Sequence, residues 1–289
     1  MIEIMRTDVT KSDRAEPSPV TNSLLLQDIA PVLVGSIPVH PVTLAQTLAF
    51  FVAAIESGRK TLVMYANAHA VTLASRDQRL ATCFRRADLV FCDGKSVQWA
   101  ARWLDSPLPA RFTPPDWIDR LCELCAARSW RLFLLGGRPG IAEAAARILR
   151  DRHEGLEVGS HHGYFHKDGQ DNQRVVAGIN EFGPQVLLVG FGMPLQEYWL
   201  DENLSHLNTN VAMSIGAMLD FVAGRVRRGP AWLTDSGFEW LTRLVREPRR
   251  LGTRYLLGNP RFVWLVLAQK WHDLTTSRNA SRHEGAESS

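Results

Sequence analysis

The chain has 289 residues, of which 45% are hydrophobic and 22% charged, and its formal net charge is +3. This length and composition are typical of a soluble globular protein with one large domain, or with one such domain and a small appendage. The longest apolar stretches, such as residues 186–193 and 262–268, are shorter than the ~20 residues that a membrane-spanning helix needs. The composition therefore excludes a transmembrane protein, and we expect any membrane association to be peripheral.

Residues 1–30 are polar and weakly patterned, which predicts a mobile N-terminal extension. No basic segment followed by an apolar one is present at the N-terminus, so no signal peptide is predicted and a reducing, cytoplasmic location is expected. Cys122 and Cys125 have the spacing of a redox or zinc pair, but they lie within a helical pattern and no second pair of ligands accompanies them. We interpret them as core residues and predict no metal site.

Strand and helix patterns alternate through residues 31–224. Strands are expected at residues 32–36, 61–65, 87–92, 131–135, 156–160, 186–189 and 211–215. Helical patterns occupy residues 42–57, the segment ending at 75, the segment starting at 96, and the segment around the two cysteines. Further helices are expected up to residue 150, at 170–182 and from 194 onward. This alternation predicts an α/β fold with a mostly parallel sheet and helices on both faces.

Asp93 is the first candidate for chemistry, because it directly follows the apolar strand 87–92 and precedes a glycine and a helix. Ligands of open parallel sheets bind beyond the carboxyl ends of the strands, where this carboxylate is expected to lie. The alternative is that Asp93 only caps the following helix, since Asp is among the preferred N-cap residues. A second polar residue, Asn67, follows the strand at 61–65 in the same way.

Glycines follow two later strands, at Gly136 and at Gly192. Such loops let backbone N–H groups approach a phosphate, although their spacing is a poor match to a dinucleotide fingerprint. Gln196 and Glu197 are expected in the first turn of the helix that begins at Pro194. The neighbouring histidines at residues 161 and 162 point to opposite sides of an extended chain, which favours loop histidines over a metal site.

Residues 225–274 are rich in arginine and tryptophan and have helical spacing, which predicts a helical basic appendage. This composition has three possible interpretations: a solvated charged face, a nucleic-acid surface or a membrane interface. Tryptophan among arginines favours the boundary of lipid and water, and no nucleic-acid partner is expected. Residues 275–289 contain few apolar residues, which predicts a disordered tail.

Three segments together resemble the WecG/TagA/CpsF family of bacterial glycosyltransferases: residues 87–94, residues 190–199, and residues 220–250 with the run Glu239-Trp240-Leu241. The resemblance covers residues 34–257. It implies a Rossmann-like sheet, no cofactor, and an inverting, metal-independent transfer. The implied donor is a UDP-sugar carrying N-acetylmannosamine, its uronic acid or glucose, and the implied acceptor is linked to polyprenyl diphosphate at the inner membrane surface. The oligomeric state stays open, with a homo-oligomer among the alternatives.

By this resemblance, Asp93 is the general base, and Asn67 and Gln196 line the substrate pocket. Glu197 and the glycines at 136 and 192 are further candidates for substrate binding because of their positions at the strand exits. Four appendage arginines are expected to neutralise the diphosphate: Arg243, Arg249, Arg250 and Arg254. The chain departs from the family pattern at Tyr65, at residues 112–116 and at Ala217, which bears on the identity of the sugar. A nucleotide-dependent oxidoreductase and a non-catalytic membrane scaffold remain the alternative functions.

Overall fold

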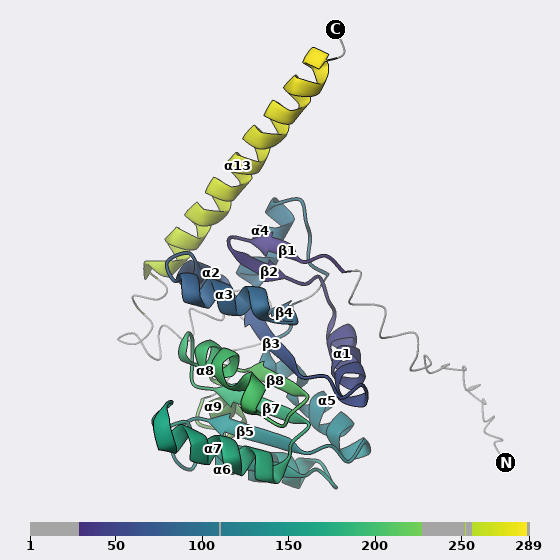
Figure 1. The fold of residues 1–289 in the computed structure, drawn as a ribbon, viewed down its shortest axis with the longest axis vertical. Coiled ribbons are helices and arrows are strands. Elements are labelled where there is room, and N and C mark those ends of the chain that lie inside the picture. The colour runs from purple at the N-terminus through teal and green to yellow at the C-terminus, as the bar shows by residue number, and fades with distance from the viewer. Residues whose placement is uncertain (1–28, 110, 227–251, 253–255, 288–289) are drawn as a thin grey trace, which may run out of the picture.

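The computed structural model describes residues 29–109, 111–226, 252 and 256–287. Its centre is a parallel sheet of six strands in the order β4-β3-β8-β7-β5-β6 (Figure 1). The strands are β3 (Thr61–Ala66), β4 (Leu89–Cys92), β5 (Leu132–Gly136), β6 (Val158–His161), β7 (Val186–Gly190) and β8 (Val211–Ser214). The predicted α/β fold with a mostly parallel sheet is therefore confirmed.

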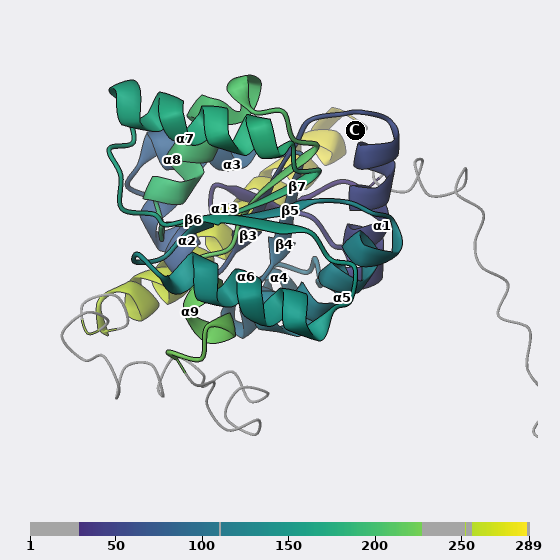
Figure 2. The same cartoon turned by 90° about the horizontal axis from the view of Figure 1, so that it is seen from below.

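Helices cover both faces of the sheet, and each face has its own apolar core. One core contains residues of α1 (Leu44–Glu56), α5 (Pro114–Ala127), α6 (Ile141–Arg152) and α9 (Met218–Val222). The other contains residues of α2 (Ala68–Ala74), α3 (Gln78–Arg86), α4 (Lys95–Trp103), α7 (Gly169–Phe182) and α8 (Leu195–Asn203). Figure 2 shows the sheet between these layers, with α3, α7 and α8 on one side and α5, α6 and α9 on the other.

The inner strands are buried on both faces, which explains their uninterrupted apolar sequences. All six residues of β3 and all five of β5 are buried. A strand covered by helices on both sides has no solvent-facing side and therefore does not alternate between apolar and polar residues. The same burial places the first polar residues after each strand at the carboxyl edge of the sheet, where the chain leaves the core.

Two local elements differ from the sequence-based expectation. The single strand expected at residues 32–36 is an antiparallel hairpin of β1 (Val32–Val34) and β2 (Ile37–Val39), whose turn contains Gly35 in the left-handed region with φ of +62°. Helix α3 was not expected at all. Its N-cap is Asp77, whose side chain accepts a hydrogen bond from Leu80 N at 3.1 Å.

A C-terminal helix, α13 (Gly258–Glu287), follows the body of the protein and packs against α2. Phe262 and Val266 on one side of α13 are buried in the core. Gln269 fixes the helix to the β1–β2 hairpin, because its side chain donates to Leu33 O at 2.9 Å and accepts from Gly35 N at 2.8 Å. Figure 1 shows the far end of α13 extending away from the sheet domain.

The helix α13 continues past residue 274, where the sequence predicts the start of a disordered tail. The expectation rests on the low apolar content of residues 275–289, which does not by itself prevent helical backbone. The domain boundaries at residues 30, 224 and 274 stay predictions. No helix in the described parts of the chain is both long enough and apolar enough to cross a lipid bilayer.

Candidate active site

Asp93 lies at the carboxyl end of β4, in the turn that leads to α4. Its backbone N–H donates to Ala66 O of the neighbouring strand β3 at 2.9 Å, so the turn continues the pairing of the two strands. The side chain is half-buried and lies at the sheet edge. Gly94, not Asp93, is the N-cap of α4. The alternative in which Asp93 serves only as the helix cap is therefore wrong.

Asn67 holds the carboxylate of Asp93. Asn67 is the N-cap of α2, and its Oδ1 accepts from Ala70 N at 3.1 Å. Its Nδ2 then points to β4 and donates to Asp93 Oδ2 at 3.2 Å. Because the cap fixes one end of the amide, the other end has a defined direction. The two polar residues that the sequence places after separate strands thus meet at one point of the sheet edge.

Aromatic side chains pack on one another at the end of β4, the strand that leads to Asp93. Phe91 of β4 stacks on Phe112 with ring centroids 4.6 Å apart and an interplanar angle of 9°. Phe112 N also donates to Cys92 O at 3.1 Å, which fixes the segment before α5 to the end of β4. The Tyr65 ring of β3 lies 6.2 Å from that of Phe91. Residue 65 and the segment 112–116, where the sequence is expected to depart from the family pattern, therefore both contact the end of the strand that leads to Asp93.

The glycines at the exits of β5, β7 and β8 pack directly on one another across the sheet edge. A Cβ atom on Gly136 would lie 2.4 Å from Gly190 O, and one on Gly190 would lie 2.6 Å from Gly216 O. A Cβ on Gly216 would in turn lie 2.6 Å from Tyr65 Oη. Contacts this short leave no room for any side chain. Close packing of neighbouring strands thus accounts for Gly136, in addition to the phosphate approach that the sequence suggests.

Gln196 and Glu197, in the first turn of α8, lie beneath these glycine loops with exposed fractions of 0%. Gln196 Oε1 accepts from Gly192 N at 3.3 Å and from Gly216 N at 3.1 Å. Gln196 Nε2 donates to Glu197 Oε1 at 2.7 Å and to Tyr65 Oη at 3.4 Å. The expected pocket residues are therefore brought together here, but as a buried layer below the sheet edge. Their contact with a substrate stays a prediction.

Burial raises the pKa of Glu197 to about 7. The Gln196 amide, the backbone N–H of Glu197 and the Ser214 hydroxyl partly offset this shift, because each favours the charged form. The effect of the Ser214 hydroxyl is the smallest of the three, and Glu197 Oε2 and Ser214 Oγ both lack a hydrogen-bond partner among the described residues. Near neutral pH, the carboxyl is thus present in both protonation states.

Lys167 is a charged residue near the sheet edge that the sequence analysis missed. Its Nζ donates to Gly163 O at 2.6 Å and to Phe165 O at 2.9 Å, and it lies 3.6 Å from the centroid of the Phe165 ring. Burial lowers its pKa to about 8. Gly163 N donates to Gly137 O at 2.8 Å, so the lysine holds a loop against the exit of β5. No local sequence pattern signals this arrangement, because the two aromatic partners of Lys167, Phe165 and Phe191, come from different loops.

The adjacent histidines contact each other, and the two cysteines at helical spacing are buried. His161 Nδ1 lies 2.8 Å from His162 O, and the two rings are 4.4 Å apart. Cys122 and Cys125 are buried in the α5 core, and burial raises the pKa of each thiol. Within the described ranges, no three His, Cys, Asp or Glu side chains are grouped as metal ligands.

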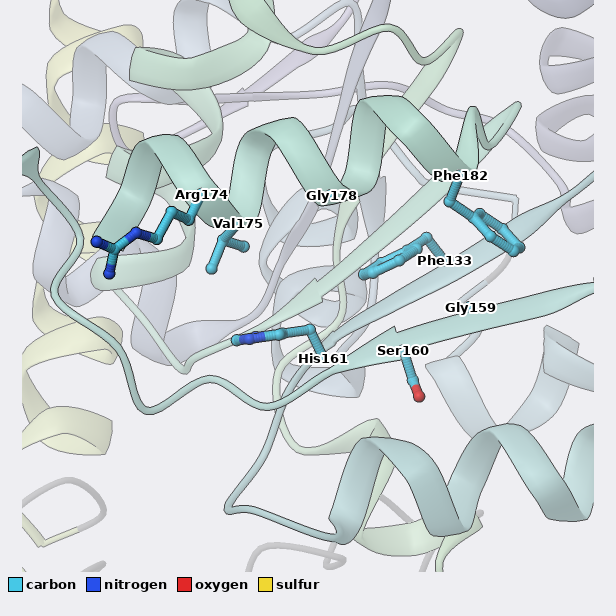
Figure 3. A pocket seen from close by; sticks show the side chains of 8 residues that line it. All are labelled: Phe133, Gly159, Ser160, His161, Arg174, Val175, Gly178 and Phe182. Atoms are coloured by element: carbon cyan, nitrogen blue, oxygen red, sulfur yellow. The ribbon is translucent and has the colours of Figure 1, made fainter. Parts of the chain in front are cut away.

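A groove of about 420 Å³ lies at the opposite edge of the sheet from Asp93, between α7 and the strands β5 and β6. Figure 3 shows Phe133 and Phe182 at its apolar side and Arg174 and His161 at its polar side. Because β6 and β4 are the two edge strands, this groove is not part of the site around Asp93. The expected arginines at 243, 249, 250 and 254 lie outside the described residues.

Comparisons with known proteins connect this site to an enzyme family. The family model for the glycosyl transferase WecG/TagA/CpsF family matches residues 32–275. Two curated proteins from Staphylococcus aureus, of strains MW2 and NCTC 8325, are each 27% identical over 215 residues, which is 74% of this chain and 83% of the relative. Both are named N-acetylglucosaminyldiphosphoundecaprenol N-acetyl-beta-D-mannosaminyltransferase. Since the family model spans most of the sequence, including the sheet edge with Asp93, this chain belongs to the WecG/TagA/CpsF family of glycosyl transferases.

Proposed function

We propose that this glycosyltransferase moves a sugar from a UDP-sugar to an acceptor linked to polyprenyl diphosphate, with Asp93 as the general base. The observation that carries the proposal is the half-buried Asp93 carboxylate at the end of β4, held by Asn67 and not used as a helix cap. The names of the relatives support a lipid-linked acceptor and an N-acetylmannosamine donor. N-acetylmannosamine, its uronic acid and glucose are the donor sugars that we propose to test.

In the proposed reaction, the acceptor hydroxyl attacks the anomeric carbon of the donor while Asp93 accepts the hydroxyl proton. A new C–O bond forms as the bond between the anomeric carbon and the UDP oxygen breaks, and UDP leaves. Attack opposite the leaving group inverts the anomeric centre, so that an α-linked UDP-sugar yields a β-glycoside. The relatives' name contains the β configuration, which agrees with inversion.

The departing diphosphate requires positive charge, which guanidinium groups supply without a metal. We propose Arg243, Arg249, Arg250 and Arg254 for this role on the basis of the family resemblance. Metal-independent transfer is part of the same proposal and is tested by adding EDTA to the assay. The family assignment favours sugar transfer over an oxidoreductase, and the packing of Gly136 against Gly190 supplies a reason for that glycine that involves no dinucleotide.

We also propose that the protein associates with the membrane surface that carries the lipid-linked acceptor. Trp264, Leu267, Trp271 and Leu274 follow one another at intervals of three and four residues along α13 and are all exposed. They lie on the side of the helix opposite Phe262 and Val266. Lys270 of α13 forms an ion pair with Asp105, which lies shortly after α4. Helix α4 exposes two further tryptophans, Trp99 and Trp103. Exposed tryptophans at this density are typical of a lipid–water boundary.

Asp93→Asn tests the catalytic part of the proposal. Asparagine preserves the shape of the side chain but cannot accept the proton, so we expect turnover to fall on the order of 10²–10⁴-fold. UDP release is measured with a panel of UDP-sugars and a short-chain polyprenyl-diphosphate sugar. Asp88→Asn provides a control, because Asp88 is an acidic residue at the other end of the same strand that pairs with Arg59. Wild-type turnover by Asp93→Asn would refute the role of Asp93, and a scaffold would show no turnover in any variant.

A further inference from the structure

Gln196 uses its complete hydrogen-bonding capacity inside the protein. Its oxygen accepts two backbone N–H groups, one from the loop after β7 and one from the loop after β8. Its nitrogen donates to Tyr65 Oη on β3 and to Glu197 Oε1 on its own helix. An amide has two donor hydrogens and two acceptor lone pairs, so these four bonds occupy all of them. Gln196 therefore connects three neighbouring strand exits and cannot contact a ligand without releasing one of them.

Glu197 is one of the partners that fix which way this amide faces. The two ends of a glutamine amide have nearly the same shape, and the hydrogen-bond partners decide which end carries the donors. The shortest of the four bonds is the 2.7 Å contact from Gln196 Nε2 to Glu197 Oε1. This acceptor oxygen favours the nitrogen at the end that faces Glu197 and Tyr65, and the N–H groups of Gly192 and Gly216 favour the oxygen at the other end.

A merely apolar packing role does not account for a carboxyl at this position. The side chain is completely buried, and its second oxygen and the nearby Ser214 Oγ both lack hydrogen-bond partners among the described residues. A buried polar group without a partner is unfavourable by comparison with an apolar residue of the same size. We therefore connect the presence of a carboxyl at this position with the hydrogen bond that it accepts from Gln196.

We propose that Glu197 is a positioning residue for sugar transfer: its carboxyl orients the Gln196 amide, which sets the loops after β7 and β8 relative to Tyr65. This inference rests on the proposed function, because it assigns Glu197 a part in the same reaction. The ring of Tyr65 lies 6.2 Å from that of Phe91, two residues before Asp93, so this ring contact connects the layer to the strand that carries the proposed base. Small errors in the placement of reacting groups lower the rate of the chemical step strongly.

Two variants of nearly equal size separate orientation from packing. Glu197→Gln retains an oxygen that can accept from Gln196 and adds an N–H group that can donate to Ser214, so we expect its kcat to stay within about threefold of the wild type. Glu197→Leu removes the acceptor, and the buried Gln196 nitrogen loses its best partner. We expect kcat to fall on the order of 10- to 100-fold, with the KM for the UDP-sugar changed by less than about threefold.

Both variants are measured at a temperature at which urea unfolding shows them to be folded. Wild-type kcat for folded Glu197→Leu would overturn the proposal, as would an equal loss for Glu197→Gln. If Glu197→Leu does not fold, Glu197→Asp serves in its place. Aspartate is one methylene shorter and withdraws its oxygen from Gln196, so the same loss of kcat is expected, and wild-type kcat would again overturn the proposal.

A double-mutant cycle with Gln196→Ala tests whether the two residues act as one unit. If Glu197 acts through Gln196, adding Glu197→Leu to Gln196→Ala should cost little more than Gln196→Ala alone. If the fold losses of kcat in the two single variants multiply in the double variant, the two residues act independently and the proposal is refuted. Asp93→Asn is run in parallel. A wild type without turnover on any donor would refute the proposed function and the role of Glu197 with it, whereas an active wild type with a fully active Glu197→Leu would refute the role of Glu197 alone.

Discussion

The contact between Gly216 and Tyr65 leads to a quantitative prediction for Gly216→Ala. Gly216 has φ of +58°, and a Cβ there would lie 2.6 Å from Tyr65 Oη and 3.5 Å from Tyr65 Cζ. A residue with a Cβ in the left-handed region costs about 1–2 kcal/mol. Displacing the Tyr65 hydroxyl adds the cost of overpacking in a dense core, about 1–3 kcal/mol. We therefore expect Gly216→Ala to lower the free energy of unfolding by about 2–5 kcal/mol.

Gly58→Ala provides a matched control. Gly58 has a similar φ of +69°, but an added Cβ would have no atom within 4 Å. This variant therefore shows the cost of the backbone conformation alone, about 1–2 kcal/mol. Tyr65→Phe removes the hydroxyl that the new methyl group would meet. In the Gly216→Ala background, it should recover much of the difference between the two alanine variants.

Urea unfolding at 25 °C, followed by circular dichroism, gives the free energy for each variant. Equal destabilisation by Gly216→Ala and Gly58→Ala would refute the steric argument. The steric argument would also be refuted if Tyr65→Phe lowered the free energy of unfolding of the Gly216→Ala variant further. Because Gly216 N also donates to Gln196 Oε1, the activity of the folded Gly216→Ala variant shows in addition whether this loop has to keep its position for turnover.

Three further predictions concern the pH dependence, the membrane and the cysteines. Burial raises the pKa of Glu197 from 4.5 to about 7, so the folded state binds the proton more tightly than the unfolded state does. As the pH rises from 4.5 to 7, the free energy of unfolding of the wild type should therefore fall by about 3 kcal/mol relative to that of Glu197→Gln. Stability curves of the two proteins that run parallel over this pH range would contradict this. Replacing both Trp264 and Trp271, which are 63% and 72% exposed, by Gln should reduce co-sedimentation with anionic liposomes and leave stability unchanged. Tyr164→Gln, which changes an exposed aromatic residue on the loop after β6, serves as the control and should have no effect. Equal sedimentation of the wild type, the double variant and the control would argue against α13 as the membrane contact. The four buried cysteines should react with a thiol reagent only upon unfolding, because burial raises the pKa of each thiol, and rapid labelling of the native protein would disprove this.

Several features of the site could be predicted because they depend on residues close together in sequence. An apolar run followed by Asp93 and Gly94 indicates a strand that ends in a turn, and Asn67 follows an earlier strand in the same way. A local signal for α3 is also present, since Asp77 precedes apolar residues at helical spacing, although the sequence-based expectation includes no helix there. The hairpin at residues 32–39 was read as one strand because the turn glycine lies in a short apolar run.

What the sequence by itself determined is the alternation of strands and helices and the chemistry available at each strand exit, because periodicity and turn residues act over a few neighbouring positions. Only the tertiary structure decided which exits meet. Asn67 reaches Asp93 across 26 residues, and Gln196 reaches Tyr65 across 131, because the strand order brings β3 next to both β4 and β8. Strand order depends on long-range packing of buried faces, and no local pattern encodes it. The same packing buries Gln196 and Glu197, which a position in the first turn of a helix does not foretell.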